Sequence, residues 1–208
     1  MILPVIIIGG GGHAKVLLDT LYLNGIEVLG IVEADPEKRG KTLLNTPIIG
    51  GDDAILIYEP GNIELVNGIG SVNLPSKRRV VFDKFKEAGF AFAKVIHPSA
   101  VIASDAEISE GIQIMAGAVI QPGCRIGKNA IINTKVSIDH DCLIDNHVHI
   151  APGVTVSGGV RIGTGAHVGA GTTIIQGVNI GSNCVIGAGS LVIRDIPDGA
   201  KVMGVPAY

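Results

Sequence analysis

The chain has 208 residues, a formal net charge of −3 and a hydrophobic content of 47%. A chain of this length and apolar content can bury a core of its own, as one large domain or two small ones. The small net charge excludes a broad basic field that would capture nucleic acid or an anionic membrane surface. Glycine occurs 30 times, tryptophan is absent and aromatic residues make up 3%, so the core must consist of small aliphatic side chains.

The first apolar run, residues 1–8, leads directly into glycines. It lacks a charged leader and is too short to span a bilayer, so it predicts a buried strand rather than a signal peptide or an anchor. We therefore expect a cytoplasmic protein with no membrane insertion.

Residues 1–95 alternate between strand-like and helix-like segments, which predicts a small, parallel, Rossmann-like α/β domain. The expected elements are strand 3–8, helix 12–23, strand 27–32, a short strand 47–49, a helix from about residue 52, strand 63–67, helix 76–88 and strand 91–95.

Four consecutive glycines, residues 9–12, follow the first predicted strand and open the first predicted helix. Bare backbone amides at a helix N-terminus can hold a phosphate group. An acidic residue, Glu33 or Asp35, comes at the end of the second strand. The arrangement predicts a site for a phosphate-bearing ligand, and a tight strand-to-helix turn without a ligand is the plainer alternative.

Binding of NAD is a further alternative for this loop. Gly9, Gly11 and Ala14 match the spacing of dinucleotide-binding loops, with an acidic residue about 20 positions later. Four adjacent glycines meet that spacing easily, the domain is short, and nothing downstream resembles a hydride-acceptor site. A nicotinamide-binding regulator is therefore the less favoured hypothesis.

The rest of the chain is a repeat with a period of six residues. From residue 96 onward an aliphatic residue recurs at every sixth position: Ile96, Ile102, Ile108, Ile114, Ile120, Ile126, Ile132, Ile138, Ile144, Ile150, Val156, Ile162, Val168, Ile174, Ile180, Ile186 and Val192. Four positions after each of them, from Ala106 to Ile196, the side chain is small or β-branched, which predicts a second inward row.

Three positions after the aliphatic residue stands, in nearly every repeat, a residue that tolerates a positive φ. These residues are Gly111, Gly117, Gly123, Gly153, Gly159, Gly165, Gly171, Gly177, Gly189, Asn129, Asn183, Asp105, Asp141 and Asp195. A unit of one short strand and one tight turn predicts a β-solenoid, with three units in each triangular coil. Residues 96–196 then form roughly five to six coils, with a height of roughly 25 Å.

This pattern resembles the bacterial hexapeptide acyltransferase superfamily, which implies a left-handed parallel β-helix and a homotrimer. A purely architectural solenoid is the alternative. The three cysteines, Cys124, Cys142 and Cys184, all fall on the second inward row and are expected to fill the core. Without a CxxC pair or a secretory context, neither disulfides nor a structural zinc site is expected.

Motifs along the whole chain are similar to those of the sialic acid O-acetyltransferase-like family of sugar acetyltransferases. They are the loop at residues 9–15, Gly68-Ile69-Gly70, the segment at residues 96–100 and the segment at residues 204–207. The resemblance implies a nucleotide-sugar-binding domain at residues 1–95 and an acetyltransferase domain with a short C-terminal tail at residues 96–208. It also implies acetyl-CoA as the co-substrate and active sites between subunits.

The resemblance also implies the substrate-binding residues. By this resemblance, Gly11, Gly12, His13, Lys15 and Gly70 contact the diphosphate and the sugar. Glu33 or Asp35 would bind the ribose or the nucleobase. Asn133 is expected to contact the sugar or the base that acts on it.

Acetyl transfer from a thioester needs a general base, donors to the oxyanion and a proton for the leaving thiolate. His140 matches the isoleucine-acid-histidine-acid segment of the family, and it should point off the prism face, so we expect it to be the base. Asp141 either orients the imidazole or is simply a turn residue. His147 and His97 are expected to be structural.

His149 and His167 are 18 residues apart, one full coil, and should stack on the same edge. By resemblance this edge lines a cleft between subunits, His149 lies near the acetyl group of the neighbouring active site, and amides near Gly158, Gly159, Gly171 and Gly177 hold pantetheine. A polar interfacial role for His167 is the alternative. Two imidazoles without an evident third ligand do not predict a metal site.

The leading hypothesis is N-acetylation of the 4-amino group of a nucleotide-linked dideoxy sugar. O-acetylation of sialic acid or another sugar shares the same fold and base. A non-catalytic sugar-binding solenoid is the hypothesis from another class, and it predicts that substitution of His140 leaves function intact.

Overall fold

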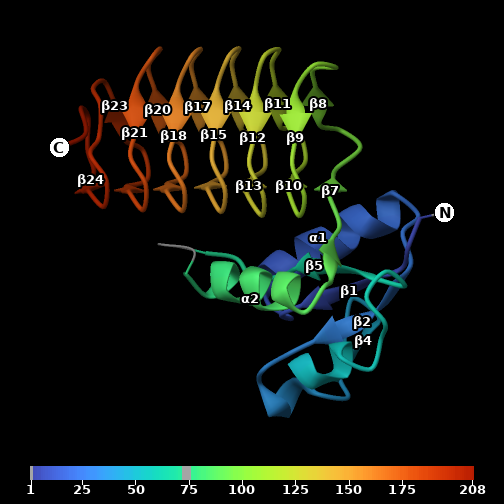
Figure 1. Cartoon of the computed structure of the whole chain (residues 1–208). Helices are drawn as coiled ribbons and strands as arrows, with labels where there is room; N and C mark the ends of the chain where they lie inside the picture. The colour runs from blue at the N-terminus through green and yellow to red at the C-terminus, as the bar shows by residue number, and fades with distance from the viewer. Residues whose placement is uncertain (1, 72–75) are drawn as a thin grey trace.

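The computed structural model describes residues 2–71 and 76–208. It contains a small α/β sheet and a triangular prism of short strands, with the C-terminus at the far end of the prism from the sheet (Figure 1).

The N-terminal sheet has six strands in the order β3-β4-β2-β1-β5-β6. Their bounds are β1 (Val5–Ile8), β2 (Val28–Val32), β3 (Thr42–Leu43), β4 (Thr46–Gly50), β5 (Glu64–Asn67) and β6 (Ala91–Phe92). All neighbours pair in parallel except β3 and β4, which form an antiparallel hairpin that the sequence did not predict. Two 3₁₀ turns, η1 (Pro36–Lys38) and η2 (Asp52–Ile55), complete it, so the helix predicted from residue 52 is a single short turn.

One helix covers each face of the sheet. α1 (Gly12–Leu23) packs Leu17 and Leu18 into a core with Ile7 of β1. That core also includes Val95 and Met115, so α1 lies between the sheet and the first coils of the prism. α2 (Ser76–Glu87) packs its phenylalanines against the opposite face of the sheet.

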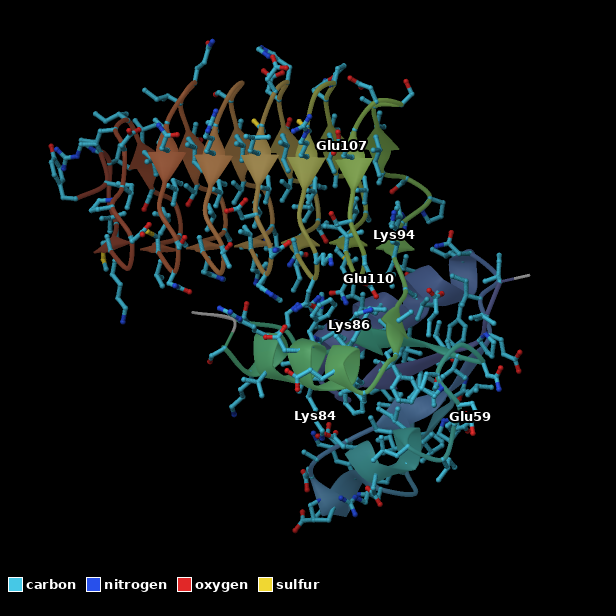
Figure 2. All side chains as sticks on the ribbon, viewed as in Figure 1. Glu59, Lys84, Lys86, Lys94, Glu107 and Glu110 are labelled. Atoms are coloured by element: carbon cyan, nitrogen blue, oxygen red, sulfur yellow. The ribbon has the colours of Figure 1, made fainter. Side chains whose placement is uncertain are left out.

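The predicted strand 91–95 is wrong as a single element. β6 ends at Phe92, the chain turns through Ala93 and Lys94, and β7 (Val95–Ile96) begins the prism. β7 pairs in parallel with β10, 18 residues further on, so its hydrogen bonds are those of the solenoid. The ion pair between Lys86 of α2 and Glu110, at 2.6 Å, also joins the two parts (Figure 2).

The prism has three parallel sheets, as the six-residue period predicts. The first sheet contains β7, β10 (Gln113–Ile114), β13 (Ile131–Ile132), β16 (His149–Ile150), β19 (His167–Val168), β22 (Val185–Ile186) and β24 (Lys201–Val202). The second contains β8 (Val101–Ile102), β11 (Val119–Ile120), β14 (Ser137–Ile138), β17 (Thr155–Val156), β20 (Thr173–Ile174) and β23 (Leu191–Val192). The third contains β9 (Glu107–Ile108), β12 (Arg125–Ile126), β15 (Leu143–Ile144), β18 (Arg161–Ile162) and β21 (Asn179–Ile180).

Successive coils are in register at 18 residues, as in the pairing of Ile120 with Ile138. Both predicted inward rows are confirmed, because they form one continuous buried cluster along the prism axis. Cys124, Cys142 and Cys184 are buried free thiols in the second row, which confirms them as core residues.

The predicted turn positions also hold, with two corrections. The glycines predicted at these positions, together with Asn129, Asp141 and Asn183, have positive φ, but Asp105 and Asp195 do not. Both lie near the ends of the prism, and their carboxylates accept hydrogen bonds from the backbone of a neighbouring coil, Gly123 N at 3.0 Å and Asn179 N at 2.8 Å. Within the described residues, no helix has the length and hydropathy that a membrane span requires.

Candidate active site

The glycine loop joins β1 to α1 at the carboxyl edge of the sheet. α1 begins after Gly11, whose φ of −90° is one that any residue can adopt. The first turn of the helix reads Gly-His-Ala-Lys, so its free amides face the loop without a competing carboxylate. A Cβ atom added at Gly11 or Gly12 would meet nothing within 4 Å, which leaves open space above these amides. An anion can therefore reach the helix N-terminus.

Glu33 holds this loop in place. Its carboxylate accepts hydrogen bonds from Gly10 N at 2.9 Å and Asp35 N at 3.3 Å, and Lys38 lies 3.4 Å away. Burial by itself raises the pKa of Glu33, but these hydrogen bonds and Lys38 outweigh it and lower the pKa overall. Asp35 instead caps the N-terminus of η1, where its carboxylate accepts a hydrogen bond from Glu37 N. The sequence could not distinguish the two acids, and only Glu33 reaches the loop.

A hollow of about 590 Å³ opens beside the loop, which we call the loop hollow. Besides the loop, it is lined by His13, Glu33, Gly70 and two prism residues, Asn133 and His149, but Lys15 is an exposed helix residue outside the lining. The α/β part and the prism therefore build this hollow together.

His13 connects the loop to the prism. Its Nε2–H donates to Oε1 of Gln113 on β10 at 2.7 Å, since the amide group of Gln113 donates to Asn67 O at 2.8 Å. Burial, and secondarily the positive charge of Arg78, lower the pKa of His13 to about 4. The ring is therefore neutral at physiological pH, and its Nδ1 remains an acceptor.

His149 is held at both ring nitrogens. Nδ1 lies 2.8 Å from Ser71 Oγ, and the side-chain amide of Asn133 donates to Nε2 at 3.3 Å. Burial is the main reason that the pKa of His149 falls to about 3, with His167 adding to it. The His167 ring stands edge-on to His149 with centroids 4.9 Å apart, which confirms the predicted stacking.

A groove of about 550 Å³ continues from the loop hollow along the prism. Ser71, Asn133 and His149 line both spaces, so the two meet at these side chains. Beyond His167 the groove is lined by small residues of successive coils, Gly169, Ala170, Gly187 and Ala188. These four were not predicted, although the 18-residue period relates Gly169 to Gly187 and Ala170 to Ala188.

His140 and Asp141 occupy a different corner of the prism, between β14 and β15. The Asp141 carboxylate accepts a hydrogen bond from His140 Nδ1 at 2.8 Å, which leaves Nε2 free to accept a proton. Asp141 is therefore more than a turn residue, although its φ of 59° fits that role as well. One coil later, a Cβ atom at Gly158 would lie 2.6 Å from His140 Nε2, so this glycine makes room for the ring.

The hydrogen bond to Asp141, with the charge of nearby Asp139, raises the pKa of the exposed His140 ring. A base must be neutral to accept a proton, so activity should fall as the pH drops through this raised pKa. Asp141→Asn removes one negative charge, and we expect the acid limb of the kcat/KM profile to move to lower pH. The measurement is kcat/KM against pH for both proteins. Ionisation of the substrate amine affects the wild type and the variant equally. If the acid limbs of the two profiles coincide, Asp141 does not raise the pKa of His140.

The structure separates the predicted site residues into two groups. Asn133, His149 and His167 lie along the first prism sheet, and His13 of α1 faces the same sheet through Gln113, whereas His140 lies on the corner opposite that face. Gly158, Gly159 and Gly177 lie on the His140 corner, because Gly159 and Gly177 donate to the carbonyls of residues 140 and 158. Gly171 belongs to the corner at Pro152, beside the groove. One chain therefore does not bring the base and the loop hollow together.

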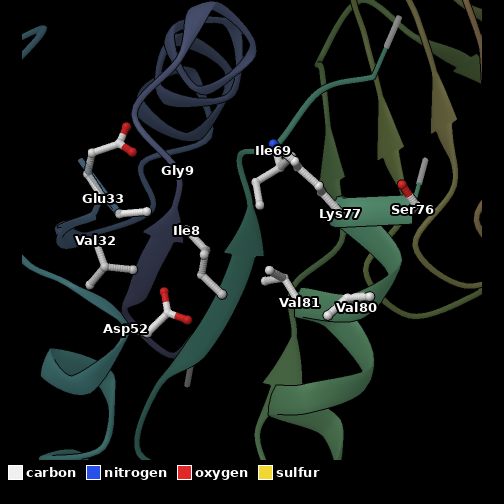
Figure 3. A pocket seen from close by; sticks show the side chains of 11 residues that line it. Ile8, Gly9, Val32, Glu33, Asp52, Ile69, Ser76, Lys77, Val80 and Val81 are labelled. Carbon is white, nitrogen blue, oxygen red and sulfur yellow. The ribbon is translucent and has the colours of Figure 1, made fainter. Parts of the chain in front are cut away.

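A second hollow, the apolar slot, lies at the carboxyl ends of the central strands. It measures about 420 Å³ and lies between Ile8 and Val32 of the sheet and Val80 and Val81 of α2 (Figure 3). Glu33 lines both the slot and the loop hollow. β1 lies between β2 and β5, so the slot is at the point where the strand order reverses, a usual place for a nucleotide in open α/β sheets.

Comparisons with known proteins agree with this architecture. Residues 4–85 match a family model described as the PglD N-terminal domain. Residues 141–176 match the bacterial transferase hexapeptide model, and residues 159–194 match the hexapeptide repeat of succinyl-transferase.

Solved structures that are similar over the whole chain include the following two. One is a histidine-to-asparagine mutant of perosamine N-acetyltransferase from Caulobacter crescentus in complex with CoA and GDP-perosamine. It is 39% identical with a TM-score of 0.93, and the match covers 100% of this chain and 97% of that one. The other is the acetyltransferase domain of PglB from Neisseria gonorrhoeae in complex with acetyl coenzyme A, 34% identical with a TM-score of 0.92 and coverage of 100% and 99%.

The fold and the site thus define a hexapeptide-repeat acyltransferase. The sequence identity of 34–39% to sugar acetyltransferases over the whole chain places the protein in one family within this class. The chain belongs to the family of acetyl-CoA-dependent sugar acetyltransferases that combine a PglD-type N-terminal domain with a left-handed β-helix.

Proposed function

We propose that this protein transfers the acetyl group of acetyl-CoA to the 4-amino group of a nucleotide-linked amino-dideoxy sugar. The observation that carries the proposal is the junction of the loop hollow and the groove at Ser71, Asn133 and His149. A nucleotide sugar in the hollow and acetyl-CoA in the groove would meet there. The CoA and GDP-perosamine in the C. crescentus enzyme support this pair of ligands.

We assign residues 1–95 to the nucleotide sugar and residues 96–208 to acetyl transfer. The aliphatic side chains that line the apolar slot suit a nucleobase, and the amides at Gly11 and Gly12 suit the diphosphate. The sugar would then extend past His13 toward Asn133. Pantetheine would follow the groove past His167 and Gly169, where small side chains leave room for it. Both substrates are metabolites of the cytoplasm, where we place the protein.

We infer a homotrimer with each active site between two subunits. In one chain His140 faces away from the loop hollow, so it can reach the sugar only in a neighbouring subunit. In this assembly one subunit supplies the loop hollow with Asn133 and His149, and the next supplies His140, Asp141 and the nearby Gly158 and Gly159.

In the proposed reaction, the sugar amine and the imidazole of His140 both start in their neutral forms. The sugar amine attacks the carbonyl carbon of the thioester, and Nε2 of His140 takes the proton that the nitrogen loses. Asp141 holds the ring through Nδ1 and stabilises the imidazolium. The carbon–sulfur bond then breaks, and the proton passes from His140 to the departing thiolate. CoA leaves as a thiol, and His140 returns to its neutral form.

The test is incubation with acetyl-CoA and a panel of GDP-, UDP- and dTDP-linked 4-amino sugars, with detection of free thiol. Thiol release with one amino sugar, together with an acetylated product of the expected mass, supports the proposal. Release only with sialic acid or another hydroxyl acceptor would establish O-acetylation instead. No release with any acceptor would favour a sugar-binding solenoid without catalysis.

The diphosphate position gives a separate prediction. Gly11→Asp places a carboxylate where the diphosphate should lie, so we expect the KM for the nucleotide sugar to rise at least about tenfold by like-charge repulsion. Aspartate is a favoured residue at a helix N-cap and the position has open space, so the fold should be retained. Gly11→Asn is the matched neutral control. Equal KM values for the two variants would argue against a diphosphate at this loop.

A further inference from the structure

Arg78 is a buried cation between the α/β part and the prism. It is the third residue of α2 and only 1% exposed, whereas its neighbour Arg79 lies at the surface and pairs with Asp83 at 3.5 Å. None of the ion pairs among residues 2–71 and 76–208 involves Arg78. Burying a charge without a counter-ion is costly, so its presence calls for a role.

Within the described residues, each hydrogen bond of the Arg78 side chain goes to a backbone carbonyl. Nη1 donates to Asn67 O at 2.7 Å and to Ile69 O at 3.0 Å, and Nε donates to Asn129 O at 3.2 Å. Nη2 is buried without a hydrogen-bond partner in the described part of the chain. Burial lowers the pKa of Arg78 to about 9, which still leaves it charged at neutral pH.

These carbonyls belong to two different parts of the protein. Asn67 ends β5, and Ile69 follows in the turn Gly68–Gly70, whereas Asn129 is on a corner of the prism. The Asn67 side chain also donates to Asn129 Oδ1 at 3.3 Å. Arg78 therefore fastens the turn after β5 to the prism.

The turn that Arg78 holds is a wall of the substrate site. Ile69 lines both the loop hollow and the apolar slot, and Gly70 lines the loop hollow. The turn also packs directly against the glycine loop, since a Cβ atom at Gly68 would lie 2.6 Å from Gly9 O. A shift of this turn would therefore move the surfaces that contact both ends of a nucleotide sugar.

We propose that Arg78 is a positioning residue that holds the Gly68–Gly70 turn against the prism and so sets where the sugar of a bound nucleotide sugar meets the acetyl-CoA groove. This role rests on the proposed function. The charge of Arg78 also contributes to the lowered pKa values of His13 and His149, which agrees with its place beside the loop hollow.

The kinetic test compares Arg78→Met with Arg78→Lys and with the matched surface control Arg79→Met. A misplacement of about 1 Å can cost about 10²-fold in rate, so we expect kcat/KM for the nucleotide sugar to fall by about that factor in Arg78→Met. The KM for acetyl-CoA should stay within about twofold, because the described residues that line the groove beyond His167 all belong to the prism. Arg78→Lys keeps the charge but not the fork of donors, and should fall between wild type and Arg78→Met.

A second measurement does not depend on turnover. Hydrogen exchange of the peptide that contains residues 66–71 should be faster in both Arg78 variants than in Arg79→Met, with prism peptides unchanged. Unaltered exchange at this turn would overturn the proposal, as would equal losses for both substrates. If the wild-type protein acetylates no sugar but exchange at the turn responds to Arg78, the proposed function fails and the positioning of the turn stands. Should Arg78→Met not fold, Arg78→Lys carries both measurements.

Discussion

His140→Ala is expected to lower kcat by about 10²- to 10⁴-fold, the usual contribution of a general base. The ring is exposed, and its contacts are with its own corner of the prism, so its removal leaves both inward rows of the core intact. The measurement is steady-state thiol release at saturating acetyl-CoA and nucleotide sugar, with size and thermal stability recorded for the same preparation.

The matched control is His97→Ala. His97 lies at the junction of the two parts, where its Nδ1 accepts from Ser99 N at 3.1 Å, and it has no role in the proposed chemistry. Near wild-type activity is expected for this variant. Full activity of His140→Ala would remove the mechanism and would leave sugar binding without catalysis as the better account.

Mixing two impaired variants is expected to restore part of the activity. His140→Ala keeps an intact glycine loop, and Gly11→Asp keeps an intact base, so a mixed trimer contains one site with both. Random assembly of equal amounts makes about three quarters of the trimers mixed, each with one intact site of three, so about a quarter of wild-type activity should return. The assay uses a nucleotide-sugar concentration well below the KM of Gly11→Asp.

The control for this experiment is the same two proteins assembled separately and combined without subunit exchange, which should show only the sum of their separate residual activities. Recovery only after co-expression or co-refolding supports sites shared between subunits. If co-assembled trimers show only the summed activity of the separate variants, the base and the sugar belong to one chain. That result would contradict the homotrimeric site while leaving the glycine loop and His140 assignments open to separate tests.

The prism is the part of the fold that the sequence predicts best. Each coil repeats the same contacts at 18-residue spacing, so inward residues such as Ile138 and Cys142 are identifiable from period alone. The α/β part is less regular. The two-residue strand β3 was not predicted, and the helix predicted from about residue 52 is only the short η2 turn, because two-residue strands and single turns carry no period of their own.

Some features of the site were also predictable from the sequence, and others were not. His140 and Asp141 are adjacent in sequence, so their pairing on one corner was predictable, and the stacking of His149 on His167 followed from the coil length. The choice of Glu33 over Asp35 was not predictable, since both follow β2 and only the path of the glycine loop selects between them.

The sequence by itself determined the repeat, its core and the residue types proposed for acetyl transfer. These features depend on a local spacing that recurs in every coil. The tertiary structure alone decided which face of the prism the α/β part covers. Contacts such as His13 with Gln113 and Arg78 with Asn129 join residues 100 and 51 positions apart, and no local pattern encodes them. That docking places the loop hollow beside His149 and turns His140 away from it, which is why the proposed site takes its base from a neighbouring chain.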